Sequence, residues 1–472
     1  MWPFNRQIGS DTWQSLLVAA LVLPASCTPP DVDEPIAVMV DRQAGYGLRR
    51  HAAELAEQRM PDDPRRIAAL HDLLWQPRYP AWQRRYAIEQ LLVHDPQFKA
   101  KLQRRIVLLQ NPETRREVFD LAVRRGWKDF TPALVRAYAQ PSRGTDDLER
   151  PERAAIEKLN PGRSVEEILF DVFAWADDSH DRKQQEAAWA LLSRLCPQDE
   201  LAGMLQAAPA DSPLAADLKA AAAELGVLPV NREGILWLSD LRKPKHRSFW
   251  ERARAAVAAL GQDARAGLEL RHLPMLVKGP ANLRSQSRSE LTSRITGRLA
   301  RHEHHLKGPT YDAPMSQHPQ RFEDWQQILA WADLATIHLM LDLLEDADMT
   351  GQLFAQADKD LADQTTEHGG VIDLEAGRPV ARGYAPITRV HRWKYVPSPI
   401  MIEHLYTAVA HYHFHAQADR NSRHAGPGLG DLRMAETLGP SAVVFTFITP
   451  DTLNVDYYQK DQVVVDLGTI HR

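Results

Sequence analysis

Three histidines alternate along one short segment near the C-terminal end of the chain: His411, His413 and His415. Alternate side chains of an extended strand leave the same face, so the three imidazoles are expected to project together. At a rise of ~3.3 Å per residue, neighbouring histidines lie about 6–7 Å apart at Cα and the outer two about 13 Å apart. The spacing therefore predicts a metal site that uses His413, one neighbouring histidine and a ligand from elsewhere in the chain.

Asp431 is the carboxylate that the sequence places best to complete such a site. It follows the glycine-containing segment 421–430, in which the backbone can fold back tightly, and it opens a predicted helix over 432–438. The chain has only two cysteines, Cys27 and Cys196. Because two thiolates cannot build a cysteine zinc site, any zinc ion must take imidazole and carboxylate ligands.

An upstream segment and the histidine segment together match a catalytic pattern. Residues 366–370 read Thr-Glu-His-Gly-Gly, similar to E-x-G-G, residues 413–415 read H-x-H, and Asp431 stands at the last position of a counterpart of S-x-x-D. This order resembles the JAMM (MPN-plus) zinc metallopeptidase family over residues 348–472. The resemblance implies an α/β, cytidine-deaminase-like domain with a mixed sheet, in which His413, His415 and Asp431 bind Zn2+ and Glu367 is the general acid/base. It also implies that the reaction is hydrolysis of a peptide or isopeptide bond in a protein or peptide substrate.

One position departs from the family pattern. Gly428 stands where the motif has a serine that supports the oxyanion, and Ser422 in the longer loop is the candidate to replace it. His411 is expected to lie in the second shell or to pack, not to bind the metal. Two alternatives therefore stay open: a catalytically inactive MPN-like scaffold, and a sensor of zinc or of a small ligand that uses the same groups.

The segment that must position these residues, 347–472, is rich in β-formers. It begins with a predicted helix over 351–362. The expected strands are 370–374, 401–415, 442–449 and 463–467, with a shorter candidate at 455–458. The first part of 401–415 also fits a helix.

Residues 62–346 are predicted to be mostly helical. Helices of 62–230 resemble stacked HEAT-like pairs, with a non-repetitive bundle as the alternative, and 231–346 is a helical connecting region. Its strongest element is expected to run from Phe322 to Asp346 with Trp325 and Ile328 on the buried stripe. His302-Glu303-His304-His305 lacks the HExxH spacing, so a solvated helix face is expected there.

The N-terminus has the pattern of a targeting segment. Residues 16–23 form an apolar run that is too short to span a bilayer, and Ala25-Ser26 precede Cys27. This resembles a bacterial lipobox, which implies lipidation of Cys27, a tether over 28–61 and an exported lipoprotein anchored on the periplasmic or cell-surface side of a membrane. An ordinary cleaved signal (1–27) is the alternative.

Length and charge set the remaining limits. A chain of 472 residues exceeds one core and predicts a multidomain protein. The net charge is −5 and no basic run stands out, so the sequence predicts no nucleic-acid partner.

Overall fold

The structure, a computed structural model, describes residues 32–109, 111–140, 146–174, 182–209, 212–306, 318–392, 394–416 and 425–472. Cys27 and Ser422 lie outside these residues. The chain forms two compact units, one ending at Val118 and the other beginning at Phe119. The boundaries predicted after residues 230 and 346 both fall inside the second unit, because its helices pack against the C-terminal sheet.

The first unit is helical and includes most of the predicted tether. The tether prediction is wrong for residues 35–40 and 46–59, which form two helices that pack on each other. Apolar side chains such as Met39, Ala52 and Ala56 are buried there, and an extended tether would leave them in water. The helices are α1 (Pro35–Val40), α2 (Tyr46–Arg59), α3 (Pro64–Trp75), α4 (Ala81–His94), α5 (Phe98–Arg105) and α6 (Pro112–Arg124), which crosses the boundary between the units.

The helices at the start of the second unit pack mainly on their neighbours in sequence, such as α9 on α10 and α11 on α12. Their ends follow the predicted caps: Ser164 and Glu167 exchange side-chain hydrogen bonds with each other's backbone N–H groups. Among the residues described, no helix combines the length and the apolar content that a membrane crossing requires. The helices are α7 (Thr131–Ala139), α8 (Pro151–Leu159), α9 (Val165–Ala174), α10 (Arg182–Leu195), α11 (Gln198–Gln206), α12 (Pro213–Leu225), α13 (Arg232–Leu241), α14 (Arg247–Ala258), α15 (Gln262–Arg265), α16 (Leu273–Lys278) and α17 (Arg288–Leu299).

The long helix predicted from Phe322 to Asp346 is instead two helices, α18 (Phe322–Trp325) and α19 (Trp331–Glu345). The guanidinium of Arg288 donates to the carbonyls of residues 326, 327 and 329, which a continuous helix would use internally. Ile328 is 66% exposed, so its assignment to a buried stripe is also wrong. The solvated helix face expected at 302–305 is also wrong, since residues 301–306 are not helical. The side chain of His304 instead hydrogen-bonds with Asp466 of the sheet.

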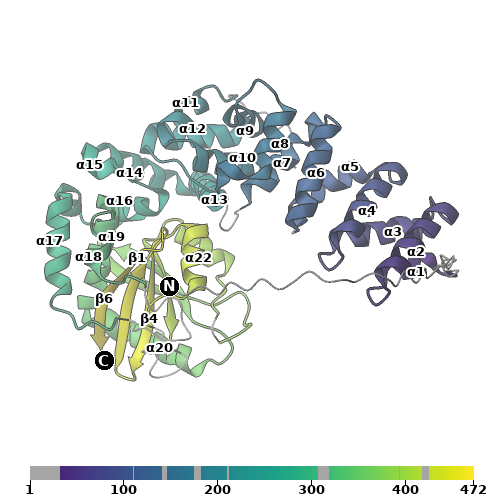
Figure 1. Cartoon of the computed structure of the whole chain (residues 1–472). Helices are drawn as coiled ribbons and strands as arrows, with labels where there is room; N and C mark the ends of the chain where they lie inside the picture. Colours follow the sequence, from purple (N-terminus) through teal and green to yellow (C-terminus); the bar gives the residue numbers. More distant parts are fainter. Residues whose placement is uncertain are drawn as a thin grey trace, which may run out of the picture. The chain divides into compact units, whose positions relative to one another are not determined.

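A six-stranded mixed sheet forms the C-terminal part of the second unit (Figure 1). Its order is β2-β1-β3-β4-β5-β6, with β3 and β4 parallel and the other neighbours antiparallel. The predicted strands are confirmed, except that only 410–415 of the segment 401–415 is a strand; its first part belongs to a helix whose N-terminus is capped by Ser398. The strands are β1 (Gly369–Glu375), β2 (Arg378–Tyr384), β3 (Ala410–His415), β4 (Ala442–Thr449), β5 (Thr452–Tyr458) and β6 (Val464–His471).

Helices lie on both faces of this sheet. On one face α21 (Pro399–Leu405) packs Met401 and Leu405 on Val371, and α22 (Leu429–Leu438) packs on β4 to β6. On the other face α20 (Ala347–Ala362) contributes Phe354, whose ring lies 6.1 Å from that of Phe447. The alternate residues of β3 therefore divide between two covered faces, and the histidines share the face of α21 and α22.

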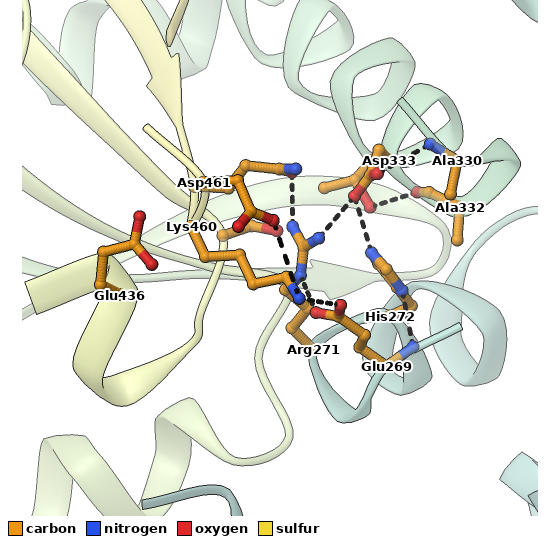
Figure 2. A network of polar contacts seen from close by, with 12 residues as sticks. Glu269, Arg271, His272, Ala330, Ala332, Asp333, Glu436, Lys460 and Asp461 are labelled. Atoms are coloured by element: carbon orange, nitrogen blue, oxygen red, sulfur yellow. Dashed lines mark hydrogen bonds and ion pairs between the residues drawn. The ribbon is translucent and has the colours of Figure 1, made fainter. Parts of the chain in front are cut away.

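A buried polar network joins the helical layer to the turn between β5 and β6. Figure 2 shows Arg271 between the carboxylates of Glu269 and Asp333, at 2.9 and 2.8 Å. His272 Nε2 lies 2.9 Å from the same Asp333 oxygen, and Lys460 reaches Glu269 at 2.5 Å. Because every charge in the network has a partner of opposite sign, we interpret the network as a structural contact between the helices and the sheet.

Candidate metal centre

Two strand histidines and one helix carboxylate converge on the covered face of the sheet. His413 Nε2 lies 3.2 Å from His415 Nε2, and the two nitrogens lie 3.4 and 3.5 Å from Asp431 Oδ1 and Oδ2. His413 is buried, whereas His415 and Asp431 are half-buried. This is the group of side chains, among the residues described, that could hold a metal ion. The convergence predicted from the H-x-H spacing and the downstream aspartate is confirmed.

The spacing of these atoms fits zinc. Bonds of about 2.0–2.2 Å from a tetrahedral zinc ion separate its ligand atoms by roughly 3.3–3.5 Å, close to the distances found here. Imidazole nitrogen and carboxylate oxygen are both ordinary zinc ligands, and three protein ligands leave one position for a water or a substrate atom.

The start of α22 holds Asp431 in place. Asp431 is the third residue of the helix, and its Oδ2 accepts a 2.7 Å hydrogen bond from the N–H of Gly428, the N-cap residue. A carboxylate in the first turn also interacts favourably with the helix dipole. The Gly428 backbone has a φ of −82°, which any residue adopts. A Cβ added there would meet Asp431 Oδ2 at 3.5 Å, an ordinary contact, so a serine fits this position.

Glu367 lies just before β1 and is only 7% exposed. Its Oε2 accepts a 3.1 Å hydrogen bond from the backbone N–H of Tyr395, which fixes the direction of the carboxylate. Burial raises the pKa of Glu367, a shift that the nearby His413 and His415 oppose only in part. A carboxyl group with a raised pKa suits the exchange of a proton near neutral pH.

His413 and Asp431 each favour the charged form of the other. Burial opposes ionisation of both groups, but the charges and hydrogen bonds of His413 and His415 together lower the pKa of Asp431 well below its usual range. In the same way Asp431 raises the pKa of His413. Because a metal ligand must be deprotonated, a cation that binds at Nε2 of His413 competes with a proton there.

His411 lies on the same strand face but outside this group. Its ring stacks on that of His413, with centroids 5.6 Å apart, and faces Tyr395 on the other side at 6.1 Å. Burial lowers the pKa of His411 to about 3, so the imidazole stays neutral. Its predicted place beside the ligands, and not among them, agrees with this geometry.

Helix α13 contacts both helices that flank the site. Trp237 Nε1 donates to the carbonyl of Tyr406, directly after α21, at 2.9 Å. Asn231 Nδ2 donates to the carbonyl of Thr437, in the last turn of α22, at 3.1 Å. The helical layer thus fixes the far end of the helix whose first turn carries Asp431.

Sequence reasoning missed two residues that position the site, Asp360 and Tyr395. Asp360 is fully buried on α20 and accepts hydrogen bonds from the N–H groups of His368 and Ala416. One signal was available: with Met349, Leu353 and Ala357, Asp360 continues an apolar stripe at helical spacing. No comparable signal marks Tyr395, which acts through its backbone.

Comparison with known proteins gives no relative: no protein-family model, curated protein or solved structure matches this chain.

Proposed function

We propose that this protein is a zinc-dependent peptide or isopeptide hydrolase of the JAMM type. The observation that carries the proposal is the convergence of His413, His415 and Asp431 at 3.2–3.5 Å. The buried Glu367 feels the charges of all three groups. A structural cluster needs no oriented carboxylate of raised pKa beside it, whereas hydrolysis does.

The residues divide the work as follows. His413, His415 and Asp431 hold the ion, which when bound supplies a Lewis acid and brings the pKa of a bound water near 7. Glu367, oriented by the N–H of Tyr395, accepts the proton of the attacking water and returns it to the leaving amine. Burial of Glu367 and His413 keeps bulk water from screening these charges.

The sequence also suggests roles for the rest of the chain. Lipidation of Cys27 anchors the protein on the outer side of a bacterial membrane, and the helical units recruit or position a protein substrate. The contacts of α13 with α21 and α22 give the helical layer a physical connection to the site.

A second candidate function rests on Gly428. Without the motif hydroxyl the domain lacks one oxyanion donor, worth roughly 2–4 kcal/mol of transition-state stabilisation. A non-catalytic scaffold that keeps its metal is therefore the alternative.

Hydrolysis of a broad peptide and isopeptide library by the full-length, zinc-loaded chain separates the two functions. We expect turnover that chelation abolishes and that Glu367→Gln lowers by about 10²–10⁴-fold while zinc is retained. No turnover by wild type would favour the scaffold. Gly428→Ser, which the local geometry accommodates, should then gain activity if the missing hydroxyl is the cause.

A further inference from the structure

The candidate ligand His413 and two side chains near it carry buried polar atoms that have no hydrogen-bond partner among the described residues. These atoms are both ring nitrogens of His411, Nδ1 of His413 and the hydroxyl of Tyr458. The three side chains are at most 3% exposed. Buried polar groups are almost always paired with protein or with ordered water, so three unpaired neighbours require an explanation.

The three side chains are neighbours on the face of the sheet that carries the candidate ligands. The register places His411 opposite Ala442, and Ala442 opposite Tyr458 on the next strand. The ring of His413 stacks on that of His411 at 5.6 Å between centroids and makes a T-shaped contact with the ring of Tyr458 at 6.3 Å and 90°. The only side chain that lies between His411 and Tyr458 in this register is the methyl group of Ala442.

When His413 binds a metal, its Nδ1–H requires a hydrogen-bond acceptor. Nε2 faces His415 and Asp431, so Nδ1 must carry the ring proton when Nε2 binds a cation. A histidine that binds a metal almost always donates its second N–H to a carboxylate, a carbonyl or a water. A buried water needs two to four polar partners, which these three groups supply.

We propose that Tyr458 and His411 hold the Nδ1–H of His413 through one buried water and so act as positioning residues for this ligand. The water has two lone pairs, which accept from His413 Nδ1–H and from the Tyr458 hydroxyl, and it donates to the unprotonated nitrogen of neutral His411. The inference rests on the metal centre of the proposed function.

Tyr458 is the informative member because its ring alone would satisfy the packing. The ring lies in an apolar cluster with Leu432, Ala435 and Val444, where phenylalanine would fill almost the same volume. The adjacent Tyr457 provides a matched control, since its hydroxyl donates to Gln459 Oε1 at 2.6 Å and lies 3.1 Å from Ser441 Oγ, away from the histidines.

The test is a zinc titration of the metal-free, full-length chain, with Co2+ spectra as a second readout. Tyr458→Phe should weaken zinc binding about 10–100-fold and shift the Co2+ absorption bands. His411→Phe, which keeps an aromatic ring and removes both nitrogens, should do the same. Tyr457→Phe should leave zinc affinity unchanged and lower the melting temperature.

Other outcomes overturn the inference. Tyr458→Phe with wild-type zinc affinity, an unchanged Co2+ spectrum and a higher metal-free melting temperature would make the hydroxyl an unpaired group of the core. In that case the proposed function survives. A wild-type chain that binds no zinc refutes both the inference and the metal centre on which it rests.

Discussion

Asp360 Oδ2 accepts a 3.1 Å hydrogen bond from the backbone N–H of Ala416, and its Oδ1 accepts a 2.6 Å bond from that of His368. Ala416 directly follows the ligand His415, and His368 directly follows Glu367. One buried carboxylate on α20 thus sets the spacing between the candidate general base and a candidate ligand.

Asp360→Asn should destabilise the protein by about 1–3 kcal/mol, because the new amide group meets one of the two N–H groups as a donor. Chemical denaturation of the full chain measures this change. Asp358→Asn is the matched control on the same helix: its exposed pair with Arg472, at 2.8 Å, should contribute less than about 1 kcal/mol. Equal losses for the two variants would contradict the role of Asp360.

Arg271→Met should cost about 3–5 kcal/mol, because it removes a buried cation shared by the buried Asp333 and the half-buried Glu269. Arg247→Met removes an exposed i,i+4 pair with Glu251 and should change stability very little. Thermal melting of both variants decides whether the network in Figure 2 clamps the helical layer to the sheet. A melting temperature for Arg271→Met equal to that of the control would show that it does not.

His304 should make stability depend on pH. Its Nδ1 lies 3.0 Å from Asp466 Oδ2 and its Nε2 lies 2.8 Å from the Leu299 carbonyl, so both nitrogens donate only as imidazolium. The bond to Asp466 raises the pKa of His304 above 6.5. With the folded-state pKa higher than the unfolded-state value, this stabilisation is complete below about pH 6.5 and is lost as the pH rises through the folded-state pKa.

The measurement for His304 is the difference in melting temperature between wild type and His304→Gln. This difference should be largest below about pH 6.5 and should shrink as the pH rises above it. Asp466→Asn, which removes the charged partner, should flatten it. A difference that grows with pH would reverse the sign and refute the assignment.

Cys27 should carry a lipid, a prediction that concerns residues outside the described ranges. Metabolic labelling with a fatty acid should mark the wild-type chain and not Cys27→Ser. Cys196→Ser should label normally, because that thiol is 8% exposed on the helical layer. Label that persists in Cys27→Ser would refute the lipobox interpretation.

The site was predictable because its signals are local. Alternate histidines on one strand and an aspartate at a helix start fix the directions of side chains from backbone periodicity alone. The tertiary contacts that distant parts of the chain make with these residues could not be predicted. Asp360 joins two strand ends across 56 residues of sequence, and Tyr458 arrives from two strands away.

The fold was predictable where one face of an element is apolar, as in 442–449. The edge strand β2 was missed because its sequence contains Pro379, Gly383 and two arginines. An edge strand tolerates such residues because one side needs no partner, so it lacks the usual alternation. The tether prediction failed because its helices are short and gain their stability by packing on each other, which local sequence patterns do not show.

The zinc content of the purified full-length chain, after dialysis with zinc and then against metal-free buffer, tests the central claim most directly. We expect about one zinc ion per chain in wild type, Glu367→Gln and His404→Gln. His404 is the histidine control because it bonds Asp373 at 3.0 Å, outside the ligand group. His413→Ala, His415→Ala and Asp431→Ala should each lose the ion. A zinc-free wild type, or full occupancy in His413→Ala, would contradict the metal centre.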